Sequence, residues 1–305
     1  MEMTIDIAAN SDIELTRPPV PDQLRERIGL AVRNIGIPPR PAILDEIDRE
    51  MRKDDPDFKR MANIIGSDVG LAACVIKVAN SPALGIGKPV RTIQDALLVL
   101  GLRLTVHSIA AIVLQGIFPR VPSLERFWDS AARCARVSRW LVLQQRGFWQ
   151  VNPDDAYTFG LFRDCGLPVL LIPFPSYVNV LIQANHDKIQ NFTAIENAAL
   201  GLNHADVGAQ LASEWRLPEE VVLAICYHHD AGLFKPDCGD LVRRRAALLA
   251  GVALTADYLI QKTTGLSQDC EWEKLGEDVQ TFLGLTPERL AQLLADGTEI
   301  VNGDL

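Results

Sequence analysis

The sequence predicts an all-α protein made of two packed helical lobes. Apolar residues recur at spacings of three and four along most of the 305-residue chain, which is the period of an amphipathic helix. Alternating strand patterns are nearly absent, and no internal repeat is apparent. A proline-bounded turn from Pro119 to Pro122 separates an earlier from a later group of helical segments. We therefore expect helices only, with the boundary between the lobes near residue 120.

The first lobe is expected over residues 17–120, after a loose N-terminal tail at 1–16. A helix is predicted at 22–35, followed by the extended linker Ile37 to Pro41, because each proline restricts its own φ and its predecessor. Apolar stripes then predict helices over 43–51, 58–65, 71–78, 96–100 and 102–118.

The second lobe is expected over residues 121–265. A long helix carries one apolar face from Leu124 through Trp128 to Val142. Further helical segments are predicted near 153–163, 175–186, 193–201, 204–215, 218–229 and 239–262. Residues 266–305 add helices near 270–283 and 287–296, which could pack on the second lobe or form a homodimer surface.

Composition excludes several classes of protein. The net charge of −9 and the pI near 5.1 argue against general nucleic-acid binding and against an anionic membrane surface. The N-terminus lacks the pattern of a signal peptide, and no stretch reads as 18 or more apolar residues in a row. The six cysteines form no CxxC pair, which favours a reducing, cytoplasmic location.

A polar series on this apolar background predicts a functional pocket. Its members are Asp164, His204, His228, His229 and Asp257, and they include three of the five histidines in the chain. Imidazole and carboxylate groups from separate helices are what a divalent metal site needs. The 24 residues between His204 and His228 fit two antiparallel helices with a short turn, which would bring the start of one helix beside the end of the other.

His228 and His229 are adjacent in sequence, which limits whether both can enter one pocket. Neighbouring side chains on a helix point about 100° apart, so both imidazoles can enter one pocket only if the helix end unwinds. Otherwise one of them is a C-terminal residue that interacts with the helix dipole. Asn203 is expected to cap the helix that begins at His204, and Gly208 is expected to let a neighbouring helix approach closely.

A series of motifs in order resembles the HDOD family, a bacterial relative of the HD phosphohydrolases. The resemblance spans roughly residues 36 to 232. It rests on the segments Ile37 to Pro41, Met61 to Asp68, Val78 to Pro82, Ala96 to Gly101, Phe127 to Ser130, Phe159 to Gly166, and 196–229. It implies that the second lobe is a degenerate HD-type helical bundle.

The resemblance also assigns positions in the metal pattern. It places the first metal-binding histidine on Asp129, the name-giving His-Asp pair on Arg163 and Asp164, and the late aspartate on Asp257. An arginine offers no lone pair to a metal, so the site is expected to be incomplete. We therefore expect no cofactor, or a residual divalent ion such as iron, manganese or nickel. Arg163 and Asp129 become candidate ligand-binding residues.

Three functions remain open at this point. The leading one is a non-catalytic bacterial signal-transduction or scaffold module acting through protein partners, which the resemblance links to cyclic di-GMP signalling. The alternative is a metal-dependent phosphohydrolase acting on cyclic dinucleotides or nucleotides. The third is sensing of a small anionic ligand by Arg163 and the histidines, because a guanidinium suits phosphate and carboxylate.

Overall fold

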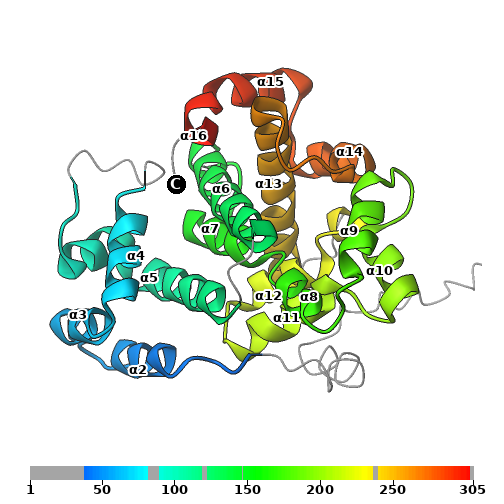
Figure 1. Cartoon of the computed structure of the whole chain (residues 1–305). Helices are drawn as coiled ribbons and strands as arrows, with labels where there is room; N and C mark the ends of the chain where they lie inside the picture. Colours follow the sequence, from blue (N-terminus) through cyan, green and yellow to red (C-terminus); the bar gives the residue numbers. More distant parts are fainter. Residues whose placement is uncertain (1–37, 82–88, 119–121, 146, 236–239, 303–305) are drawn as a thin grey trace, which may run out of the picture.

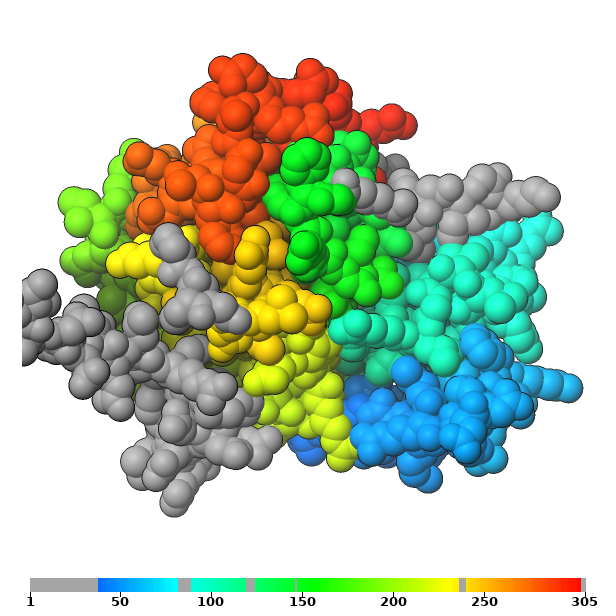
Figure 2. All heavy atoms as spheres, turned by 180° about the vertical axis from the view of Figure 1, so that it is seen from behind, coloured from blue at the N-terminus to red at the C-terminus, as the bar shows by residue number. Residues whose placement is uncertain are grey.

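The computed structural model describes residues 38–81, 89–118, 122–145, 147–235 and 240–302. The predicted tail at 1–16 and helix at 22–35 lie outside these residues. Within the described ranges every regular element is a helix, as the apolar periodicity predicts. Figure 1 shows α2 to α5 on one side of the molecule and the later helices on the other, and the same division is visible from behind in Figure 2.

The first group begins after the proline linker. Its members are α2 (Ala42–Met51), α3 (Phe58–Gly66), α4 (Val69–Ala79) and α5 (Ile93–Ile117). Aspartate side chains accept hydrogen bonds from the first backbone amides of α3 and α4, and Thr92 does so for α5, which satisfies donors that have no partner within the helix. Gly101 has φ 70° and ψ 166° within α5, so the two helices predicted over 96–100 and 102–118 meet at a kink.

Among the described residues, one helix is long and apolar enough to be compared with a membrane span. By length and hydropathy α5 could cross a membrane, with 25 residues and a mean hydropathy of 2.1 in its most apolar window. However, 56% of that window is buried inside the protein, and the kink at Gly101 divides the helix. Such burial is typical of a core helix, and we interpret α5 as one.

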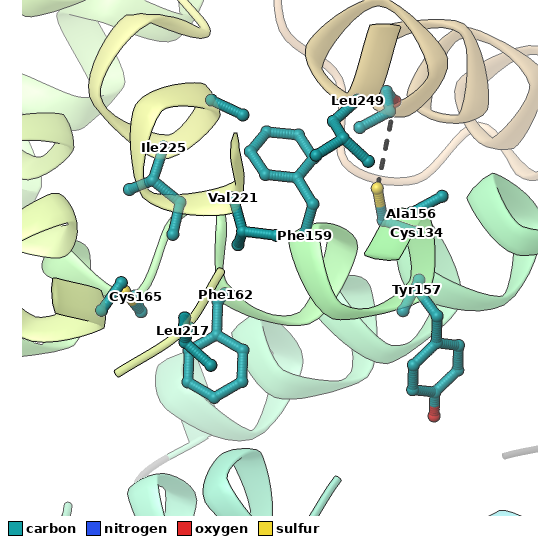
Figure 3. Packing of buried hydrophobic residues seen from close by; sticks show 14 of the residues in the cluster. Cys134, Ala156, Tyr157, Phe159, Phe162, Cys165, Leu217, Val221, Ile225 and Leu249 are labelled. Atoms are coloured by element: carbon teal, nitrogen blue, oxygen red, sulfur yellow. Dashed lines mark hydrogen bonds between the residues drawn. The ribbon is translucent and has the colours of Figure 1, made fainter. Parts of the chain in front are cut away.

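The second group surrounds α13 and α7. It comprises α6 (Pro122–Gln144), α7 (Pro153–Phe162), α8 (Gly166–Leu171), α9 (Tyr177–His186), α10 (Phe192–Leu200), α11 (His204–Glu214), α12 (Glu219–Tyr227), η2 (Ala231–Phe234) and α13 (Leu241–Thr264). The chain continues through α14 (Glu271–Leu283), α15 (Pro287–Asp296) and α16 (Thr298–Asn302), and α14 and α16 pack on α13. Phe159 of α7 lies between Val221 of α12 and Leu249 of α13 (Figure 3).

Glycine permits the closest helix contacts of this group. A Cβ on Gly160 would lie 2.5 Å from the Cα of Ala135, so α6 and α7 approach almost backbone to backbone. A Cβ on Gly166 would lie 2.0 Å from the carbonyl oxygen of His204. Gly208 completes this second contact, because its own Cβ would lie 3.2 Å from the amide nitrogen of Gly166. The close approach expected at Gly208 is therefore present, and it fixes α8 against α11.

Polar contacts connect the two groups of helices. The Trp215 indole donates to the carbonyl of Pro38 at 2.9 Å, and Arg40 Nε donates to the carbonyl of Trp215 at 3.1 Å. Arg40 also forms ion pairs with Asp45 and Asp48. These contacts attach the proline linker to the end of α11. Whether the lobes divide at residues 120 and 265 remains a prediction.

Candidate metal centre

The predicted polar series meets at the ends of several helices. Asp164 follows α7, and His204 is the first residue of α11, where the Asn203 side chain accepts a hydrogen bond from the amide of Asp206 as a cap. Helix α12 ends at Tyr227, so His228 and His229 lie in the turn beyond it. The unwinding that the sequence required for both imidazoles to share a pocket is therefore present.

The three imidazoles face one another through their Nε2 atoms. His204 Nε2 lies 3.4 Å from His228 Nε2 and 3.2 Å from His229 Nε2. Asp164 Oδ1 lies 3.5 Å from His204 Nε2 and 3.3 Å from His228 Nε2. One donor atom from each of these four residues lies within 4.8 Å of every other.

The opposite nitrogen of each imidazole, Nδ1, meets an oxygen acceptor. His204 Nδ1 lies 2.8 Å from Glu196 Oε2, and His228 Nδ1 lies 2.8 Å from the carbonyl of Ile225. His229 Nδ1 is bonded to Glu271 Oε2. A proton on each Nδ1 directs the Nε2 lone pairs inward, which is the usual arrangement of metal-binding histidines. Lone pairs that face one another repel unless a proton or a metal ion lies between them.

The donor set therefore fits a divalent metal ion. Nitrogens bound to one ion at about 2.0–2.1 Å lie about 3 to 3.4 Å apart, which is close to the Nε2 separations in the cluster. Three imidazoles and one carboxylate suit zinc, iron, nickel or manganese. Asp164, His204, His228 and His229 are the residues that could hold such an ion.

The pKa values of His204 and His228 shift in opposite directions. Burial lowers the pKa of His204, but the Glu196 carboxylate and Asp164 raise it to about 10. Burial and the neighbouring His229 lower the pKa of His228 to about 4. Without a metal, His204 therefore carries a proton between its neighbours. An ion that binds in the cluster must displace this proton.

Arg163 lies beside Asp164 and Asp257. Its Nε donates to Asp164 Oδ2 at 2.9 Å, and its guanidinium also donates to Asp257 Oδ2. The side chains of Arg163, Asp164 and Asp257 are 17%, 23% and 12% exposed, so one guanidinium offsets part of the charge of two carboxylates away from bulk water. Burial raises the pKa of Asp164, but the charge of Arg163 holds it well below the ordinary value. Asp257 thus lies beside Arg163, and the structure does not bring it into the four-residue donor cluster.

Asp129 lies elsewhere. It belongs to α6 and lines a separate cavity with Trp128 and Arg136. The structure therefore separates Asp129 from Arg163, the other candidate ligand-binding residue.

The sequence did not predict the two carboxylates that bond to the histidines. Glu196 is fully buried and also accepts a hydrogen bond from the Tyr177 hydroxyl, and Glu271 begins α14. A signal for Glu196 was present, because it shares the buried face of α10 with Phe192 and Ile195, where a carboxylate needs a partner. Phe192 also stacks on the His229 ring at 4.7 Å between centroids. No local pattern marks Glu271, which comes 42 residues after its histidine.

Comparisons with known proteins show the family and the fold of this chain. The family profile described as the HDOD domain matches residues 37–231. An uncharacterized protein from Treponema pallidum (strain Nichols) is 26% identical over 202 residues, which is 66% of this chain. The matched region spans only 39% of that relative's length.

Solved structures share the fold. A candidate signal-transduction protein from Marinobacter aquaeolei VT8 matches with a TM-score of 0.65 and 21% identity, over 92% of this chain and 64% of that chain. A candidate phosphohydrolase from Shewanella amazonensis SB2B matches with a TM-score of 0.63 and 21% identity, over 89% of this chain and 95% of that chain. At such identities the likeness concerns the fold alone.

Proposed function

Because this chain belongs to the HDOD domain family, we propose that it is a signal-transduction module that acts through protein partners and does not hydrolyse phosphate esters. In this proposal Asp164, His204, His228 and His229 hold a single divalent ion. The expectation of no cofactor is thereby replaced by that of one ion. The observation that carries the proposal is the position of Arg163, which pairs with Asp164 and Asp257 at once.

Arg163 works against a second metal ion. In a two-metal hydrolytic site the two ions lie about 3.5–4 Å apart and hold both the attacking and the leaving oxygen. Here Asp164 turns Oδ1 toward the histidines, and Arg163 binds Oδ2. Asp257, the remaining carboxylate of the predicted series, is bound to the same guanidinium. The guanidinium thus occupies the carboxylate oxygens that a second cation would need as ligands.

The space at the cluster also supports this proposal. The cavity lined by the histidines, Arg163 and Phe192 has a volume of about 90 Å³. Pockets that enclose small organic ligands usually measure about 300–1,000 Å³. The cavity therefore suits an ion and a few waters better than a nucleotide.

A single ion would have a clear structural effect. Its four ligands come from the α7–α8 connection, the start of α11 and the turn after α12. When bound, a divalent ion supplies positive charge and Lewis acidity at this junction. The four ligands fix the three helix ends relative to one another. A module that presents a defined surface to a partner requires helices held in fixed positions. Signalling partners, a cytoplasmic location and a link to cyclic di-GMP are parts of this proposal.

A hydrolysis assay tests the proposal. The purified chain would be incubated with manganese, iron or nickel and a panel of nucleotides and cyclic dinucleotides. We expect wild type and Asp164→Ala to give the same background rate, because Arg163 occupies the carboxylate oxygens that a second metal ion or an attacking water would need. Turnover that Asp164→Ala abolishes would refute the non-catalytic function.

The metal-dependent phosphohydrolase remains the second candidate. The observation that favours it is the donor cluster itself, because Asp164 Oδ1 and three Nε2 atoms converge within 4.8 Å. A candidate phosphohydrolase is also among the proteins of similar fold. The same assay decides between the two functions.

A further inference from the structure

Helix α10 contains none of the four candidate metal ligands, but one of its faces contacts the histidines that are. Asn191, the residue that caps α10, donates from its side-chain amide to the carbonyl of His229. The Phe192 ring stacks on His229 and lies edge-on to His204, with 5.4 Å between centroids. Glu196 lies one turn further along α10 and bonds to His204. Helix α9 packs beside α10, away from the first group of helices (Figure 1).

Glu196 holds His204 at two points. Its Oε1 and Oε2 lie 2.9 and 2.8 Å from His204 Nδ1. Its Oε2 also accepts a hydrogen bond from the backbone amide of His204 at 3.4 Å. His204 is the first residue of α11, where a backbone amide has no partner within the helix. The same carboxylate therefore orients the imidazole and fixes the start of the helix that carries it.

Tyr177 of α9 fixes Glu196 in turn. Its hydroxyl donates to Glu196 Oε1, and Glu196 is the hydrogen-bond partner of this hydroxyl among the described residues. Tyr177 and Glu196 are 0% exposed, and His204 is 1% exposed. Because bulk water does not reach these side chains, it cannot replace a hydrogen bond that one of them loses. The three residues thus form a buried chain from α9 through α10 to the metal ligand on α11.

The other two histidines are held differently. His228 Nδ1 lies 2.8 Å from the carbonyl of Ile225, three residues earlier in the same turn of chain. His229 Nδ1 is bonded to Glu271 of α14, whose second oxygen lies 2.6 Å from Lys274 Nζ. His204 is therefore the ligand whose orientation depends on α9 and α10.

A carboxylate bonded to the far nitrogen of a metal-binding imidazole has two effects. It fixes the ring, and it makes the opposite nitrogen a stronger donor to the metal. The negative charge of Glu196 also offsets part of the positive charge of an ion bound out of contact with water. Loss of such a partner typically weakens metal binding by about 10–100-fold.

We propose that Glu196 and Tyr177 are positioning residues of the metal centre. Tyr177 fixes the Glu196 carboxylate, and Glu196 directs His204 Nε2 toward the ion. Both roles rest on the proposed function, because they require an ion bound by Asp164 and the three histidines. It follows that a hydroxyl on α9, which is not a metal ligand, controls the affinity and the coordination of the ion.

Titration of the metal-free full chain with Co²⁺ tests these roles. The visible absorption of Co²⁺ depends on the number and geometry of its ligands, and competition with a chromophoric chelator measures its affinity. Glu196→Gln keeps the shape of the side chain but removes its charge, and should weaken Co²⁺ binding by about 10–100-fold. It should also change the absorption spectrum, because the His204 ring is no longer fixed. Tyr177→Phe should weaken binding several-fold.

Tyr157→Phe is the matched control. Tyr157 is also buried, but it lines a different cavity from that of the histidines. Loss of its hydroxyl should leave both the Co²⁺ affinity and the spectrum as in wild type. All variants are compared at a temperature at which circular dichroism shows them folded, so a difference in affinity concerns the site. If Glu196→Gln does not fold, Tyr177→Phe against Tyr157→Phe decides.

Three results would overturn the positioning roles. Equal Co²⁺ affinities and spectra of wild type and Tyr177→Phe would do so while leaving the ion in place. Equal losses of affinity in Tyr177→Phe and Tyr157→Phe would mean that a missing hydroxyl acts through the general stability of the fold. A wild-type chain that binds no Co²⁺ would refute the metal centre of the proposed function, and both roles with it.

Discussion

Replacing Gly166 with alanine is expected to destabilise the protein by about 3 kcal/mol or more and to weaken metal binding. The added Cβ would lie 2.0 Å from the carbonyl oxygen of His204 and 2.8 Å from the amide nitrogen of Gly208. Both are backbone atoms, so no side-chain rotation can make room. Helices α8 and α11 must separate, and His204 moves with the start of α11. Urea denaturation measures the first effect, and metal titration measures the second.

Gly116→Ala is the matched control for this substitution. Gly116 is an exposed glycine of α5, and an added Cβ would meet no atom within 4 Å. Alanine within a helix is about 1 kcal/mol more favourable than glycine, so this variant should be as stable as wild type or slightly more stable. Equal stabilities of Gly166→Ala and Gly116→Ala would contradict the close packing of α8 on α11.

Replacing Arg163 with methionine should lower the free energy of unfolding by about 3–5 kcal/mol, because removal of one partner leaves buried charges uncompensated. Methionine roughly preserves the volume of the side chain but leaves both Asp164 and Asp257 without their shared cation. Chemical denaturation of metal-free protein measures the loss. Adding Asp257→Asn to the variant should restore part of it, since one unpaired charge is then removed.

The surface ion pair of Arg216 supplies the control. Arg216 and Asp45 are 58% and 44% exposed and lie 3.3 Å apart, and exposed pairs of this kind contribute about 0–1 kcal/mol. Arg216→Met should therefore change stability by less than 1 kcal/mol. A similarly small effect of Arg163→Met would mean that Arg163 does not stabilise the two aspartates.

Local patterns predicted much of the fold and part of the site. The cap at Asn203 correctly predicted that α11 begins at His204. Because neighbouring side chains on a helix point about 100° apart, the sequence also predicted that α12 must end before His228 and His229 can share a pocket. These features depend on residues close in sequence. The sequence likewise predicted separate helices over 96–100 and 102–118, and the structure has a kink between them at Gly101.

Tertiary contacts were beyond the reach of the sequence. Nothing local indicates that Asp257, 94 residues after Arg163, bonds to the guanidinium instead of joining the histidines. Glu271 meets His229 only because α14 packs on α13. Asp129 was placed by family position alone, and its helix turns it to a different cavity.

The most direct test of the central claim is the metal content of the chain. Protein purified without chelators would be analysed for iron, manganese, nickel and zinc, beside His228→Ala as the variant that lacks one ligand. We predict about one divalent ion per wild-type chain and a clear loss in His228→Ala. Two ions per chain would contradict the role given to Arg163, and no ion after supplementation with each metal would contradict the metal centre itself.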